Sequence, residues 1–118
     1  MKAALLASVA AALVLGGSAL ADQLPPGWTH AEVNVTVRGT SHTLIYDRGR
    51  VQSVSAAAVV LRELDGSVVT VTLSSSTRVF VDGSRAGIAA VQPGMRAQTV
   101  RVDGGAAKQL RAFSRRAR

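Results

Sequence analysis

An aspartate–glycine pair between two valine-rich segments is the feature that most restricts how this chain can fold. Residues 59–62 precede Asp65-Gly66 and residues 69–73 follow it, and each segment alternates apolar side chains with others along its length. A period of two residues is typical of half-buried β-strands, and an aspartate–glycine pair is typical of the turn that joins two of them. The region therefore predicts an antiparallel β-hairpin.

The length of the loop decides which side chains face each other across this hairpin. A two-residue loop would set the apolar side chains of one strand opposite the polar side chains of the other. A three-residue loop, Leu64-Asp65-Gly66, with its glycine in the left-handed conformation, instead places Leu61 opposite Val69 and Val59 opposite Val71. We predict the second register. A helix over residues 56–64 is the alternative, and the β-branched residues on both sides of the turn disfavour it.

Similar alternation predicts further strands at residues 32–38, 43–47, 77–82, 95–102 and 106–113, with turns at 39–41, 82–84 and 103–105. Val51 and Val54 are three residues apart and cannot share a face of a regular strand, so we expect a β-bulge near Gln52-Ser53. Residues 86–91 end at Pro93-Gly94 and predict one short helical turn.

The predicted fold is all-β: a small antiparallel β-barrel over residues 30–113, with the helical turn at one end of the barrel. Residues 22–29 contain Pro25-Pro26-Gly27 and predict a stiff extended connector. We expect Trp28 to cover an end of the barrel, the alternative being an exposed aromatic residue for binding. Residues 114–118 predict a basic, disordered tail.

The amino-terminal 21 residues predict a signal peptide. Lys2 supplies a positive charge, residues 3–15 are apolar, and Ala19-Leu20-Ala21 is a small-x-small cleavage sequence. Gly16-Gly17-Ser18 interrupts the apolar run before it reaches the ~20 residues of a membrane-spanning helix. We therefore expect a secreted or periplasmic protein, cleaved after Ala21 and carrying no transmembrane anchor. The chain contains no cysteine, so its stability cannot depend on disulfides.

The order of these features resembles a bacterial domain-of-unknown-function family of small exported OB-like β-barrels. Such members have an RG-x-V strand, an aspartate–glycine hairpin, an SST-x-V strand, a PGM or PGD turn and a last glycine-turn hairpin. The corresponding segments here are 48–51, 65–66, 75–79, 93–95 and 103–105. The resemblance implies an exported OB-like barrel; it supplies no catalytic residues and names no activity.

The polar residues offer no catalytic constellation, and we expect a non-catalytic binding or structural module of the cell envelope. The serines lack a nucleophile elbow, and Asp65, Asp82 and Asp103 each precede a glycine, as turn residues do. We expect no enzyme and no cofactor. As an alternative, a hairpin between His30 and His42 would bring the two imidazoles together, and with Glu32 or Asp47 they could hold a transition metal in a periplasmic barrel.

Positive charge is the most distinctive surface property, with a formal net charge of +7. We predict weak anion binding by the basic residues near the carboxyl terminus, and an anionic envelope polymer or another exported protein as the partner. Export makes nucleic acid an unexpected physiological partner, and we expect a monomer. The alternative is a solvated tail that only promotes solubility. The candidate anion-binding residues are Lys108, Arg111, Arg115, Arg116 and Arg118.

Overall fold

The structure, a computed structural model, describes residues 24–115 and consists of strands and one short helical turn. The predicted signal peptide and residues 116–118 of the predicted tail lie outside the described residues. The elements are β1 (His30–Val37), β2 (Thr40–Val54), β3 (Ala58–Arg62), β4 (Val68–Thr72), β5 (Arg78–Val81), β6 (Ser84–Ala86), the 3-10 turn η1 (Ile88–Ala90), β7 (Arg96–Val102) and β8 (Ala107–Phe113).

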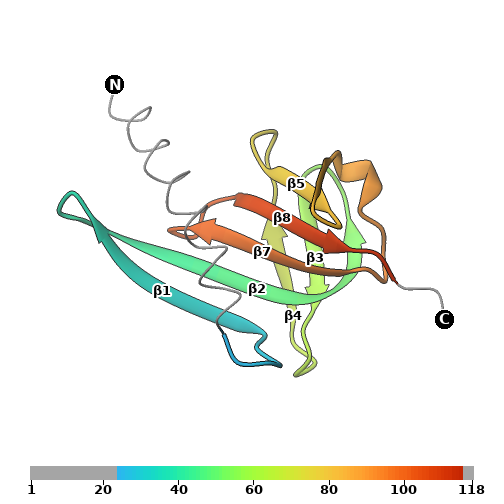
Figure 1. Cartoon of the computed structure of the whole chain (residues 1–118), viewed down its shortest axis with the longest axis horizontal. Coiled ribbons are helices and arrows are strands. Elements are labelled where there is room, and N and C mark those ends of the chain that lie inside the picture. The colour runs from blue at the N-terminus through green and yellow to red at the C-terminus, as the bar shows by residue number, and fades with distance from the viewer. Residues whose placement is uncertain (1–23, 116–118) are drawn as a thin grey trace.

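Seven of the strands form a continuous sheet in the order β4-β3-β2-β7-β8-β5-β6, and β1 pairs with β2 outside this path. All pairs are antiparallel except β5 with β8, which is parallel. The long strand β2 runs through the centre and contacts β1, β3 and β7 (Figure 1). The prediction of an all-β chain with one short helical turn is confirmed.

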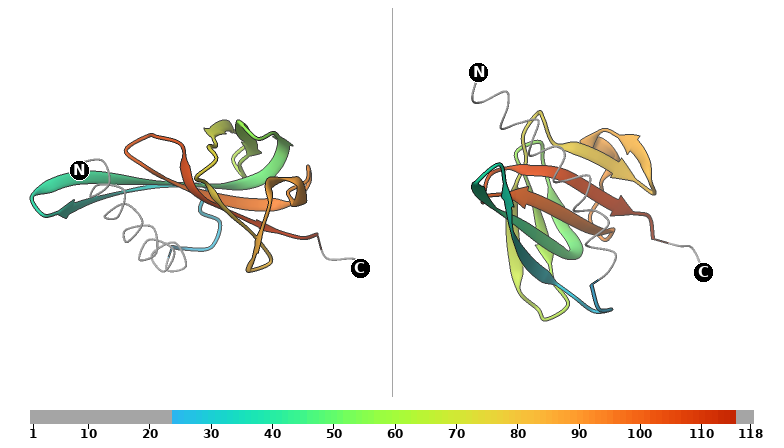
Figure 2. Two further views of the ribbon diagram at one scale, coloured as in Figure 1. Left: turned by 90° about the horizontal axis from the view of Figure 1, so that it is seen from above. Right: turned by 60° about the vertical axis from the view of Figure 1, so that its left-hand side comes forward.

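The sheet is not closed, so the predicted barrel is wrong. Closure would require β4 to pair with a strand at the other end of the sheet. In residues 24–115, however, β4 pairs with β3 alone. At the other end of the sheet, β5 pairs with β8 on one side and with β6 on the other. The β3–β4 hairpin stands steeply across the direction of β7 and β8, and the curved sheet remains open between its two ends (Figures 1 and 2).

The register of the β3–β4 hairpin is the predicted one. Leu61 lies opposite Val69 and Val59 opposite Val71. The backbone of Glu63 pairs with that of Ser67 across the three-residue loop, and the loop glycine has a φ of 89°. Apolar side chains thus meet apolar side chains on one face of the hairpin.

The predicted bulge is also present, because the pairing of β2 with β3 shifts between Val51 and Ser53. The first hairpin differs from the prediction: its turn is Arg38-Gly39, not residues 39–41, and Thr40 is already paired with Val37. Both turn residues have positive φ, 51° and 78°, which gives the twist that a two-residue hairpin turn requires.

The predicted extended connector contains a β-turn. The Trp28 amide donates to the Pro25 carbonyl, and Gly27 supplies a φ of 85°. Trp28 then packs against Tyr46 edge to face, with the ring centroids 6.5 Å apart. It covers part of the sheet, since no barrel end exists. In the described residues there is no helix with the length and apolar character needed to cross a membrane.

Apolar side chains form two clusters on opposite faces of the central strands. The main cluster lies inside the curve of the sheet and includes Leu61, Val71 and Leu110, all fully buried. The second cluster contains Leu44, Tyr46, Val100 and Val102, with Trp28, Ala31, Val33 and Val35 packed against it. Strand β7 contributes to both clusters, and this explains why its sequence shows no single alternation.

Candidate functional site

The alternation of β2 separates two kinds of polar residue between the two faces of the sheet. Val51 belongs to the main cluster, so Gly49 and Asp47, two and four residues earlier, lie on the same inward face. Arg48 and Arg50 lie on the outward face. One short segment therefore contributes to two chemically different surfaces.

Pairing with the neighbouring strands extends the basic outward face. Arg50 lies opposite Arg62 of β3 on one side and opposite Arg96 of β7 on the other. Arg48 lies opposite Gln98. Because residues that are directly opposite share a face, three arginines stand in one row across three adjacent strands.

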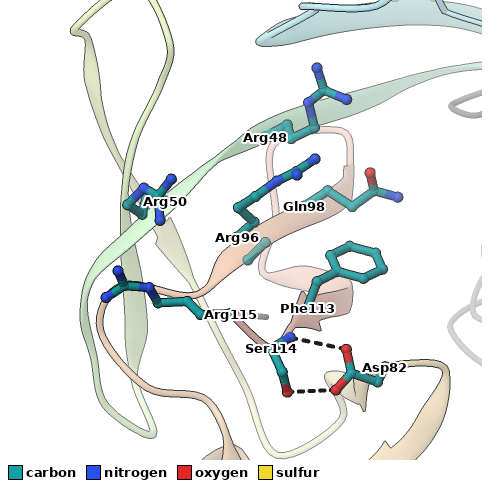
Figure 3. Close-up of a pocket in the computed structure, with 9 residues that line it drawn as sticks. Arg48, Arg50, Asp82, Arg96, Gln98, Phe113, Ser114 and Arg115 are labelled. Carbon is teal, nitrogen blue, oxygen red and sulfur yellow. Dashed lines mark hydrogen bonds between the residues drawn. The ribbon is translucent and has the colours of Figure 1, made fainter. Parts of the chain in front are cut away.

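Part of this face is hollowed into a groove of about 640 Å³, which we call the arginine groove. Figure 3 shows Arg48 and Arg96 extending from neighbouring strands toward the same side, with Phe113 beside them. Arg50 Nη1 donates to the Gly94 carbonyl at 2.9 Å, and Arg115 approaches the same glycine. The groove is lined by Arg48, Arg50, Asp82, Arg96, Ala97, Gln98, Phe113, Ser114 and Arg115.

The groove carries four arginines and one carboxylate. That carboxylate, Asp82, accepts hydrogen bonds from the backbone amide and the hydroxyl of Ser114 (Figure 3). The guanidinium of Arg48 lies 4.7 Å from the centre of the Trp28 ring. Partial burial, and then the positive charge of Arg96, lower the pKa of Arg48 below its usual value. The groove is thus a concentration of positive charge.

A second hollow, of about 530 Å³, shares Arg48, Arg50 and Arg96 with the groove and continues toward β3. It adds Arg62 to the cationic lining, and it also includes Glu63. The basic surface therefore reaches from β8 to β3, and one acid lies at its β3 end.

On the inward face, three residues from separate elements form a second polar site, which we call the carboxylate cluster: His30, Asp47 and Glu63. One ligand atom from each lies within 4.8 Å of the others. His30 Nδ1 is 2.7 Å from Asp47 Oδ1, and His30 Nε2 is 2.9 Å from Glu32 Oε2. Hydrogen bonding to Asp47, and then to Glu32, raises the pKa of His30.

The two carboxylates of the cluster are buried. The Asp47 side chain is 2% exposed, and Glu63 is 7% exposed. Within residues 24–115, neither Asp47 Oδ2 nor Glu63 Oε2 accepts a hydrogen bond, and Arg101 Nη2 lies 3.7 Å from Asp47 Oδ2. Burial, then hydrogen bonding to the Asp47 carboxyl, and then the charge of Asp47 raise the pKa of Glu63 to about 7.

The structure does not bring His30 and His42 together. His30 lies opposite Asp47, whereas His42 lies opposite Val35, five residues farther along β1 and on the other face. Five residues of a strand span roughly 17 Å. His42 Nδ1 instead lies 2.8 Å from a carboxylate oxygen of Asp103. Glu32 and Asp47, the two acids considered beside His30, both contact it, whereas Glu63 was not among the predicted residues.

Of the predicted anion-binding residues, Arg115 lines the groove, and Arg111 lies opposite Gln98 on the same face. Lys108 is exposed on β8 and does not line the groove. Arg116 and Arg118 lie outside the described residues. Sequence reasoning missed Arg48, Arg50 and Arg96, because these residues converge only through the pairing of β2 with β7. The one indication in the sequence was their alternate spacing along predicted strands, which places Arg48 and Arg50 on the same face.

The fold and these two sites define a small all-β protein with an arginine-lined outward face and a buried carboxylate cluster. Comparison of the chain with protein-family models, with curated proteins and with solved structures found no match.

Proposed function

We propose that this protein is an exported, non-catalytic binding module whose arginine groove binds an anionic polymer of the cell envelope, such as an acidic glycan. The observation that carries the proposal is the convergence of Arg48, Arg50, Arg96 and Arg115 on one groove. Export is inferred from the signal-like amino-terminal sequence.

The electrostatics of the groove favour an anionic ligand. Like charges brought close together disfavour the charged form of each, and the lowered pKa of Arg48 reflects burial together with this repulsion. A bound anion would relieve the repulsion and would accept hydrogen bonds from the guanidinium groups. Arginine suits this role because its planar donors pair with sulfate, phosphate and carboxylate oxygens in a bidentate manner.

The arrangement of the arginines favours a polymer over a single small anion. Arg62, Arg50 and Arg96 occupy adjacent strands, and neighbouring strands lie about 4.8 Å apart. A chain with regularly spaced anionic groups would contact several arginines at once, and binding at several points strengthens the whole interaction.

The test is salt-dependent retention of the full chain on a sulfated polysaccharide matrix. We expect the double variant Arg50→Gln/Arg96→Gln to bind about tenfold more weakly, since each exposed charge contact contributes up to about 1 kcal/mol. The matched control is Arg38→Gln/Lys108→Gln, which removes the same net charge outside the groove. If both variants elute at the same reduced salt concentration, retention depends on net charge and the proposed groove function is wrong.

A further inference from the structure

We infer that His30, Asp47 and Glu63 form a binding site for a divalent transition-metal ion of the Zn²⁺ type. This inference does not depend on the proposed function, because the three side chains include none of the groove arginines, although Glu63 also lines the second hollow. It rests on the position, the burial and the chemistry of the three side chains.

The cluster forms where two strands end on the same edge of β2. The pairing of β1 with β2 ends at His30 and Asp47, and the pairing of β3 with β2 begins at Arg50. Glu63 follows β3 directly and enters the gap between the two strands. Gly49 permits this close approach, because a Cβ atom there would lie 2.4 Å from the Arg62 carbonyl oxygen and 3.2 Å from the Cα of Glu63.

Two buried carboxylate oxygens that accept no hydrogen bond indicate that a cation belongs at this position. Asp47 Oδ2 and Glu63 Oε2 accept no hydrogen bond in the described part of the chain. Buried polar groups without partners cost folding free energy, and buried charges are normally paired or coordinate a metal. Arg101 Nη2 forms an ion pair with Asp47 Oδ2 at 3.7 Å, but it is too far away to donate a hydrogen bond, and it does not reach Glu63 Oε2. A divalent ion would satisfy both oxygens.

The ligand set selects the type of metal. One imidazole and two carboxylates suit Zn²⁺ or Mn²⁺, whereas Ca²⁺ and Mg²⁺ favour oxygen ligands alone and Cu⁺ favours sulfur. Glu32 holds the second ring nitrogen of His30 at 2.9 Å, an arrangement that orients many metal-bound histidines. The His30 side chain is 43% exposed, so an ion and its water ligand can reach the site from solvent.

The test is titration of the full chain, purified without a histidine tag, with ZnCl₂ in an isothermal calorimeter. We expect one Zn²⁺ per chain. His30→Ala and Glu63→Gln should each abolish this binding, and Glu32→Gln should weaken it about 10- to 100-fold. His42→Gln is the matched control, since it removes the other histidine and should leave binding unchanged.

Circular dichroism of each variant establishes that it is folded before it is compared. As a second measurement, Zn²⁺ should raise the melting temperature of the wild-type chain and of His42→Gln, and should leave that of Glu63→Gln unchanged. The inference is overturned if the wild-type chain binds no Zn²⁺, or if binding persists in either His30→Ala or Glu63→Gln.

Discussion

Substitution of Gly49 by alanine should destabilise the fold severely, although the added group is a single methyl. The new Cβ would lie 2.4 Å from the Arg62 carbonyl oxygen and 2.8 Å from its carbonyl carbon. Both atoms belong to the backbone, so no rotamer change removes the clash. An ordinary contact begins at 3.4 Å, so β2 and the end of β3 would have to separate by roughly 1 Å.

The magnitude follows from this displacement. Forcing extra atoms into a well-packed site costs about 1–3 kcal/mol, and each weakened hydrogen bond between the strands costs about 1 kcal/mol. We expect Gly49→Ala to lower the free energy of unfolding by about 2–3 kcal/mol in total. For a domain of this size, that loss corresponds to a fall of about 10–20 °C in melting temperature.

The assay is urea denaturation followed by circular dichroism, with Gly87→Ala as the matched control. Gly87 has a φ of −90°, and a Cβ there would meet no atom within 4 Å. The control should therefore change stability by no more than about 1 kcal/mol, through the entropy of the unfolded chain. Equal destabilisation by the two substitutions would refute the claim that β2 and β3 are in close backbone contact at Gly49.

Three further predictions concern the buried carboxyl of Glu63, the core residue Leu61 and the turn residue Arg38. The raised pKa of Glu63 means that the folded chain binds a proton at this carboxyl more tightly than the unfolded chain does. In EDTA, the free energy of unfolding should therefore fall by up to about 3 kcal/mol as the pH rises from about 4.5 to 7. Glu63→Gln should remove this pH dependence in urea denaturation. Leu61→Ala should cost about 2–5 kcal/mol in the same assay because Leu61 is fully buried, whereas Leu64→Ala, at a position 75% exposed, should cost almost nothing. Arg38→Asn should raise the melting temperature by a few degrees, about 0.5–1 kcal/mol, because asparagine tolerates the positive φ of 51° better than arginine does; an unchanged melting temperature would contradict the turn conformation.

Local features of the fold could be predicted from the sequence because neighbouring residues determine them. The three-residue loop at Leu64-Asp65-Gly66 fixes the β3–β4 register, and the spacing of Val51 and Val54 requires the bulge. Barrel closure was predicted wrongly because it depends on which strands meet at the ends of the sheet. The short β6 hairpin occupies an edge of β5 that a closing strand would need, and no local pattern indicates this.

The candidate sites depend on pairing between distant strands, so the sequence indicated them only in part. His30 and Asp47 were both candidates, but their direct pairing requires the Arg38-Gly39 turn, whereas the predicted turn was at residues 39–41. The sequence did not indicate Glu63, because this residue lies just after a strand and its approach to Asp47 depends on the absence of a side chain at Gly49. The residues next to Glu63 in the sequence do not predict that its side chain is buried.

The two proposed sites depend on one property of β2, the side on which each residue of Asp47–Arg50 lies. Asp47 and Arg48 are adjacent, yet strand alternation sends their side chains to opposite faces of the sheet, where they cannot neutralise each other. A shift of β2 by one residue would place Asp47 among the groove arginines. Its carboxylate would then neutralise part of the positive charge of the groove and would be lost from the cluster. The register of β2 against β1 and β7 is therefore what preserves two sites of opposite charge within one thin sheet.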